Sequence, residues 1–151
     1  MLDVAAFLES LRALPVESHQ TGTVILRKGH TTGRLYILKQ GAVEVVDGDR
    51  CIARSNAPGA VFGELGVLLD QPHMADVRVV EPSDFYVAHG TVFLRVHREA
   101  ALHVAGVLAK RLLAVHADLD SMRRRAVEPP HDRALEEMVD AADRSLHQPL
   151  R

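Results

Sequence analysis

Hydrophobic and polar positions follow two different periods along the chain, and the change falls near residue 90. In the first part, short apolar runs alternate with glycine-containing segments, a pattern typical of β-strands joined by turns. The runs with strand character are 23–26, 35–38, 42–46, 51–54, 76–79 and 85–88. Between two of them, Asp47-Gly48 favours a tight type I′ hairpin, in which both central residues have positive φ. Several short strands at this spacing predict a sandwich or a barrel.

The second part of the chain has a helical period. No proline occurs between Arg98 and Arg125, and apolar residues recur there at steps of three or four. They are Ala101, Val104, Leu108, Leu112, Val115, Leu119 and Met122. We therefore predict one long amphipathic helix over about 98–125, and shorter helices at 3–14 and 91–96.

The segment after the long helix, 126–151, contains Pro129-Pro130 near its start. This pair ends the helix, because the residue before a proline is disfavoured in the α conformation. Residues 131–147 have a weak helical pattern with balanced charge. We predict a C-terminal tail that forms at most a short helix and is too small to be a DNA-binding domain.

Composition restricts the function classes. The chain has 151 residues, 47% hydrophobic and 25% charged, which is enough for one globular domain with its own core. The formal net charge of −2 gives no global basic field of the kind that drives non-specific nucleic-acid binding. The apolar stretches are too short for a membrane span, and the N-terminus lacks a signal-peptide pattern. With Cys51 as the single cysteine, we expect a cytoplasmic protein without an internal disulfide.

Catalytic and metal-binding motifs are not found in the sequence. The nine histidines form no i, i+4 pair and no H-E-x-x-H motif, and there is no G-x-S-x-G motif. We therefore expect no metal site, no cofactor and no enzymatic activity. Arg123-Arg124-Arg125 is a short basic cluster near the end of the predicted helix, where complementing the helix dipole is a simpler role than binding nucleic acid.

The segment 61–77 differs from its neighbours. A strand leads into Gly63 and Glu64, a short apolar turn follows and is ended by Pro72, and a new strand begins. Gly63 lets the backbone approach a ligand closely, and free N–H groups at the start of a short helix can bind an anion. Glu64 can accept a hydrogen bond from a ribose hydroxyl, but an acid in a first helical turn is also the ordinary choice against the helix dipole. These residues alone leave both interpretations open.

Several motifs together resemble the cyclic nucleotide-binding domain family, of the catabolite activator and protein kinase A regulatory-subunit type. They are Gly29, Gly33 and Gly41 around a strand with Tyr36, then Pro58-Gly59, Phe62-Gly63-Glu64-Leu65, Pro72-His73-Met74-Ala75-Asp76-Val77 and Ala109-Lys110-Arg111-Leu112. The resemblance covers about residues 1–124, which we take as the domain. It implies a mainly β fold, an eight-stranded antiparallel jelly-roll barrel with an N-terminal helix and a long C-terminal helix.

The resemblance also implies where the ligand binds. The matching positions are Phe62, Gly63, Glu64, Leu65, His73, Met74, Ala75, Val115 and His116. His73 stands where the family has an arginine that forks onto the cyclic phosphate, and an imidazole near neutral pH does not copy that charged, bidentate contact. We therefore expect a reduced affinity that improves on acidification. Alternation along the next strand places Asp76 on the other face from His73, so we expect Asp76 to be solvated.

Base recognition departs from the family pattern as well. Met74 stands where the family has a hydroxyl or an alanine, so a hydroxyl-dependent preference for guanine is not supported. Val115 and His116 stand at the helix positions that supply hydroxyls to adenine in the resemblance. His116 can still hydrogen-bond to a purine or stack on it.

Two main hypotheses follow. The first is a non-enzymatic, cyclic nucleotide-binding sensor of the cAMP type that signals through its long helix to an unknown protein partner. The alternative is the same fold without a nucleotide, acting as a dimerisation or protein-interaction module. A homodimer is predicted from a stripe with coiled-coil spacing, although only two heptads fit: Leu108, Leu112, Val115, Leu119 and Met122. DNA binding by the tail is a third and less favoured hypothesis.

Overall fold

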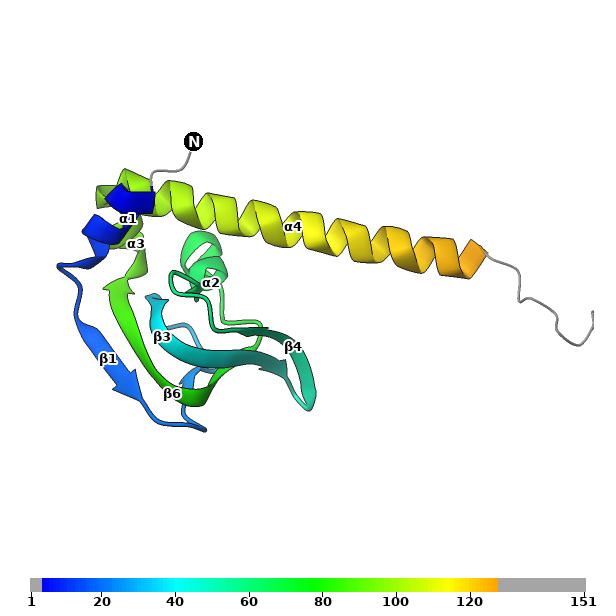
Figure 1. The fold of residues 1–151 in the computed structure, drawn as a ribbon, viewed down its shortest axis with the longest axis horizontal. Coiled ribbons are helices and arrows are strands. Elements are labelled where there is room, and N and C mark those ends of the chain that lie inside the picture. The colour runs from blue at the N-terminus through cyan, green and yellow to red at the C-terminus, as the bar shows by residue number, and fades with distance from the viewer. Residues whose placement is uncertain (1–3, 128–151) are drawn as a thin grey trace, which may run out of the picture. The chain divides into compact units, whose positions relative to one another are not determined.

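The computed structural model describes residues 4–127. In chain order its elements are α1 (Val4–Leu11), β1 (Val16–His19), β2 (Val24–Leu26), β3 (Arg34–Asp47), β4 (Arg50–Ser55), β5 (Val61–Phe62), α2 (Glu64–Leu69), β6 (Asp76–His89), α3 (Gly90–Val96) and α4 (Arg98–Val127). The chain divides into two compact units, 1–110 and 111–151, and α4 contributes to both. All the strands and the three shorter helices belong to the first unit (Figure 1).

The sheet is built around two long, curved strands, β3 and β6 (Figure 1). The six strands within residues 4–127 pair antiparallel in the order β1-β6-β3-β4, while β2 also pairs with β6 and β5 with β3. Each long strand takes in two of the short strands expected from the sequence. β3 covers 35–38 and 42–46, and β6 covers 76–79 and 85–88. The mainly β fold with flanking helices is confirmed, whereas eight separate strands become six.

Gly41 explains why β3 continues where two strands were expected. Its φ is +107°, and a Cβ at this position would lie 2.6 Å from the Cα atom of Ser83 on β6. The Ser83 hydroxyl accepts a hydrogen bond from the Ala42 N–H at 3.0 Å and donates one to the Glu81 carbonyl at 2.6 Å. The pairing of β3 with β6 shifts register between Leu38 and Val43. The glycine therefore lets the strand bend against β6 without ending.

The hairpin between β3 and β4 is confirmed, but its turn differs from the expected one. Asp47 pairs with Arg50, so the two-residue loop is Gly48-Asp49 and not Asp47-Gly48. Gly48 has a φ of +60°, whereas Asp70 is the one non-glycine residue with positive φ within residues 4–127. Type I′ is therefore wrong. Glycine as the first of two central residues is typical of a type II′ turn.

Alternation along β3 divides the hydrophobic residues into two clusters. Leu35 and Ile37 face the helices, while Tyr36 and Leu38 face the interior of the barrel. The helix-side cluster consists of Phe7, Leu11, Leu35, Ile37, Val61, Ala88, Phe93, Ala100 and Val104. The interior cluster consists of Leu26, Tyr36, Leu38, Val43, Phe62, Val77, Val79, Phe85 and Val87.

The long helix is confirmed, since α4 runs from Arg98 to Val127 where 98–125 was expected. In the first unit it buries Ala100 and Val104, and Leu108 packs at the edge of the helix-side cluster. In the second unit its large apolar side chains are exposed: Leu112, Leu113, Val115, Leu119 and Met122. The expected tail lies almost entirely outside the described residues, and the domain boundary near residue 124 stays a prediction.

By length and composition alone, α4 is the one helix within residues 4–127 that is apolar enough to cross a membrane. Its most apolar part has a mean hydropathy of 1.3, and 11% of that part is buried. A single helix of this kind is weak evidence for a membrane span. Lys110 and Arg111 also lie near the middle of α4, and charged side chains are costly at the centre of a bilayer. The absence of a membrane span stays a prediction.

Candidate functional site

The site begins at Gly63, where the chain leaves β5 and enters α2. Gly63 has a φ of +88°, and a Cβ there would lie 2.5 Å from the carbonyl oxygen of Arg34 and 3.2 Å from the Leu26 side chain. A side chain at this position would meet backbone that has no room to move, and positive φ already favours glycine. Gly63 therefore allows the turn from β5 into α2 to press against β3.

The residues on either side of Gly63 have different surroundings. Phe62 belongs to the interior cluster and pairs with Tyr36 of β3. Glu64, the first residue of α2, is 3% exposed, while Leu65 beside it is exposed. Phe62, Gly63 and Glu64 are thus brought together at the barrel, and Leu65 lies toward solvent. Binding of a ribose by Glu64 stays a prediction.

His73 is buried between α2 and the loop before β3. Its Nε2 lies 2.9 Å from the Thr32 hydroxyl oxygen, and its Nδ1 would lie 3.1 Å from a Cβ at Gly66. Its main chain is also fixed, because its N–H donates to the His30 carbonyl at 2.9 Å and its carbonyl accepts from the Gly29 N–H at 2.8 Å. The imidazole therefore already has a protein partner.

Burial lowers the pKa of His73, and the charge of His30 lowers it further. Both effects disfavour the imidazolium form. His73 is therefore neutral near pH 7, which agrees with the sequence-based expectation that it carries little positive charge there. As a neutral ring it offers one N–H donor in all, where an arginine offers a fixed charged fork.

The three residues after His73 differ in their exposure to solvent. Met74 is 69% exposed, Ala75 is half-buried, and Asp76 begins β6. Asp76 is half-buried, and its Oδ1 accepts a hydrogen bond from the Lys28 backbone N–H at 2.7 Å. Asp76 therefore stays partly open to solvent, and the segment before β3 also supplies a backbone donor to it.

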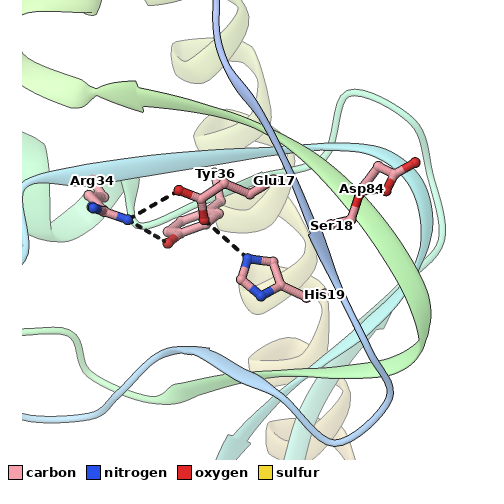
Figure 2. Close-up of polar contacts among 6 residues, drawn as sticks. All are labelled: Glu17, Ser18, His19, Arg34, Tyr36 and Asp84. Carbon is pink, nitrogen blue, oxygen red and sulfur yellow. Dashed lines mark hydrogen bonds and ion pairs between the residues drawn. The ribbon is translucent and has the colours of Figure 1, made fainter.

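Sequence reasoning missed a polar group on the inner side of β1 and β3 (Figure 2). The Arg34 Nη1 donates to Glu17 Oε1 at 3.3 Å and to the Tyr36 hydroxyl at 3.4 Å, and Glu17 Oε2 lies 3.1 Å from His19 Nε2. The hydrogen bond to Tyr36, and then the charge of Glu17, raise the pKa of Arg34. One sequence signal was available: Arg34 precedes Tyr36 by two positions in a strand, so the two share a face.

Figure 2 also shows a contact between Ser18 and Asp84, which belongs to the β1–β6 pairing and not to this polar group. Ser18 donates to Asp84 Oδ1 at 2.5 Å. This hydrogen bond, followed by one from Gln40, lowers the pKa of Asp84. The Ser18–Asp84 contact therefore helps to hold β1 on the sheet.

Val115 and His116 lie on α4 in the second unit, where both are exposed. Their expected position over a purine base stays a prediction. No group of three or more metal-ligating side chains occurs within residues 4–127, so no metal centre can be assigned there.

A groove of about 700 Å³ lies in the first unit outside the barrel. Its lining residues come from α2, α3 and the first part of α4: Val67, Leu68, Asp70, Thr91, Leu94, Arg95, Ala101, Val104, Ala105 and Leu108. None of the nine positions implied by the sequence motif is among them. The groove is therefore separate from the site at Gly63 and His73.

Comparison with known sequences bears on the site at Gly63. The sequence model of the cyclic nucleotide-binding domain matches residues 16–100, more than half of the chain. A cAMP-dependent protein kinase regulatory subunit from Yarrowia lipolytica is 28% identical over 95 residues. The match takes in 63% of this chain and 25% of that protein, so the chain spans a quarter of this relative's length.

Solved structures share the fold. The Thermus thermophilus catabolite activator protein matches with a TM-score of 0.66 and 22% identity, over 81% of this chain and 61% of that one. The regulatory domain of Toxoplasma gondii PKA, in a co-crystal with cAMP, matches with a TM-score of 0.54 and 26% identity, over 64% of this chain and 38% of that one. These likenesses confirm the jelly-roll fold expected from the sequence.

Proposed function

This chain belongs to the cyclic nucleotide-binding domain family, and from that premise we propose that it is a non-enzymatic, cytoplasmic regulatory domain that binds a cyclic nucleotide of the cAMP type. We call residues 62–77 the cassette. The turn at Gly63 carries the proposal, because it presses the start of the cassette against β3, and Glu64, the next residue, is buried. A buried carboxylate at that place suits a ribose hydroxyl donor. The PKA regulatory domain crystallised with cAMP supports the same ligand class.

The proposed ligand contacts follow the motif. The ribose and phosphate would lie on the segment from Phe62 to Leu65, with His73 and Ala75 lining the pocket beside Met74. Val115 and His116 of α4 would lie over the base. Ligand binding shifts α4 only if two conformations of the protein bind the ligand with different affinities. The proposed protein partner would then bind one position of α4 better than the other. Because His73 is buried and neutral, we propose a reduced affinity.

Isothermal titration calorimetry with cAMP and with cGMP, at about pH 6 and about pH 7.5, tests this function. We expect measurable binding at both values, tighter at the lower one. The matched variant His73→Arg restores a charged fork and is expected to raise the affinity by roughly ten- to a hundredfold. No heat with either nucleotide at near-millimolar concentration, in the wild type and in His73→Arg alike, would contradict the proposal.

The second candidate is a fold that no longer binds nucleotide and acts through α4. It is favoured by one observation, the exposed apolar side chains on the second-unit part of α4. In either case we propose a homodimer in which Leu112, Val115, Leu119 and Met122 form the contact, with Leu108 shared between that contact and the helix-side cluster.

Sedimentation velocity over a range of protein concentrations checks the dimer. We expect a dimeric mass that falls to the monomer in Leu119→Asp, because a charge at the centre of an apolar seam is costly to bury. Ala117→Asp is the matched control, since a residue two positions away lies on the opposite side of a helix. If both variants had the same sedimenting mass, the proposed dimer contact would be wrong.

A further inference from the structure

Arg34 lies on the strand beside the candidate site and is not one of the positions that the sequence motif identifies. We propose that Arg34 supplies the positive charge for the ligand's phosphate that His73 does not supply. The inference rests on the proposed function, because it concerns how the same site holds a cyclic nucleotide. A cyclic phosphate diester is an anion, and an anion that leaves water needs a charged or hydrogen-bonding partner.

The strand register places Arg34 beside the cassette. β3 and β5 pair Ile37 with Val61 and Tyr36 with Phe62. The pairing ends at Phe62, where Gly63 leads the chain out of β5 and into α2. The close approach of the Arg34 carbonyl oxygen to Gly63 shows that the two segments do remain adjacent there.

Arg34 is also linked to the other end of the cassette. Its backbone N–H donates to the Thr32 hydroxyl at 3.2 Å, and the same hydroxyl lies 2.9 Å from His73 Nε2. Thr32 therefore stands between the backbone of Arg34 and the imidazole. The backbone of Arg34 is thus tied, through one hydroxyl, to the residue at the motif's phosphate position.

The side chain of Arg34 points along the inner face of the barrel. Tyr36 belongs to the interior cluster, and alternation gives Arg34 the same face. The contact between Arg34 Nη1 and the Tyr36 hydroxyl agrees with this direction, as Figure 2 shows. The guanidinium is therefore on the side of β3 that a ligand inside the barrel would face.

The guanidinium remains available for an anion. Both of its side-chain contacts within residues 4–127 use Nη1, so Nη2 and Nε keep N–H groups for a bidentate contact with phosphate. The Arg34 and Glu17 side chains are 54% and 35% exposed, and ion pairs of that kind are worth little. When Arg34 turns to a phosphate, Glu17 keeps its contact with His19. Moving Arg34 from Glu17 to a phosphate therefore leaves neither Arg34 nor Glu17 without a hydrogen-bonding partner.

Three other cations on the barrel strands or next to them are paired with carboxylates away from the site. Arg78 binds Glu44 through both Nε and Nη2, and Arg54 approaches the same carboxylate at 3.3 Å. Lys28 contacts Asp47 at 2.6 Å. Unlike these three, Arg34 combines weak pairing with a backbone that touches Gly63 and Thr32.

The test compares the affinity of cAMP for the full chain and for Arg34→Gln by calorimetry. We expect the variant to lose roughly ten- to a hundredfold in affinity, as for loss of a charged hydrogen-bonding partner. Arg12→Gln is the matched control, because it removes the same charge from an exposed arginine on the loop after α1. Adenosine, which has no phosphate, should bind equally to all three proteins in an NMR titration at millimolar ligand. Glu17→Gln, which frees Arg34, should bind cAMP as tightly as the wild type or more tightly.

A double-mutant cycle separates a phosphate contact from a structural role. In the His73→Arg background the site has a second guanidinium, so Arg34→Gln should cost much less there than in the wild type. Equal losses in the two backgrounds, an equal loss for adenosine, or cAMP binding as tight as in Arg12→Gln would each overturn the assignment of Arg34. If the wild type and His73→Arg both bind no cyclic nucleotide, the proposed function itself fails.

Discussion

The two hydrophobic clusters lie on opposite faces of β3 and are built differently. The helix-side cluster is wholly apolar, with Leu35, Ile37 and Val61 at 0% exposure. The interior cluster contains the Tyr36 ring, which meets Phe85 edge to face at 5.8 Å and carries a hydroxyl in contact with Arg34. One face of the strand therefore packs against the helices, while the other keeps polar groups beside the apolar interior.

The largest expected effect comes from a substitution on the helix-side face of β3. Ile37→Ala removes a fully buried side chain from the helix-side cluster, so we expect a loss of about 2–5 kcal/mol in the free energy of unfolding. The protein that remains folded should bind cAMP as the wild type does, because Ile37 faces away from the site. Urea denaturation followed by calorimetry at low temperature measures both quantities.

The control for that variant is Tyr36→Phe, one position earlier on the opposite face. It keeps the ring and removes the hydroxyl, whose contact with Arg34 is long at 3.4 Å. The loss of stability should therefore be below about 1 kcal/mol, while cAMP affinity falls because Arg34 loses a group that orients it. The division between the two faces would be wrong if Ile37→Ala weakened binding and Tyr36→Phe did not.

Local patterns predicted most of the fold. Glycine spacing located the hairpin after β3, and helical period located α4 to within two residues at its end. The union of short strands into β3 and β6 was not predictable from local patterns. It depends on the contact between Gly41 and Ser83, which are far apart in sequence and meet only when the sheet forms.

Some residues of the candidate site were also predicted from the sequence, and others were not. Gly63 and Glu64 were identified through the resemblance to the family motif, because their own chemistry left two interpretations open, and the burial of Glu64 was not predicted. Thr32 was missed because it lies far from His73 in sequence and meets it only in the folded chain. Met74 is exposed, and its place beside the ligand stays a prediction.

The smallest expected effect is the dependence of stability and of binding on pH through His73. In the folded protein, burial and then His30 lower its pKa below the ordinary value, which is close to 6.5. Below that ordinary value the unfolded chain takes up the proton first, so the unliganded protein loses stability as the pH falls toward the lowered pKa. Binding of an anion has the opposite dependence, because a phosphate stabilises the imidazolium form. Affinity for cAMP should therefore rise over the same fall in pH.

Thermal unfolding and calorimetry between about pH 7.5 and about pH 5.5 measure the two opposite slopes. His73→Gln is the matched variant, because an amide can keep a hydrogen bond to Thr32 but does not titrate. We expect both slopes to flatten in His73→Gln, and the rise in affinity to be smaller than the effect of Arg34→Gln, because the buried ring already contacts Thr32. Unchanged slopes would show that the pH dependence does not come from His73. The interior face would then bind its phosphate through Arg34 without a titrating partner at His73.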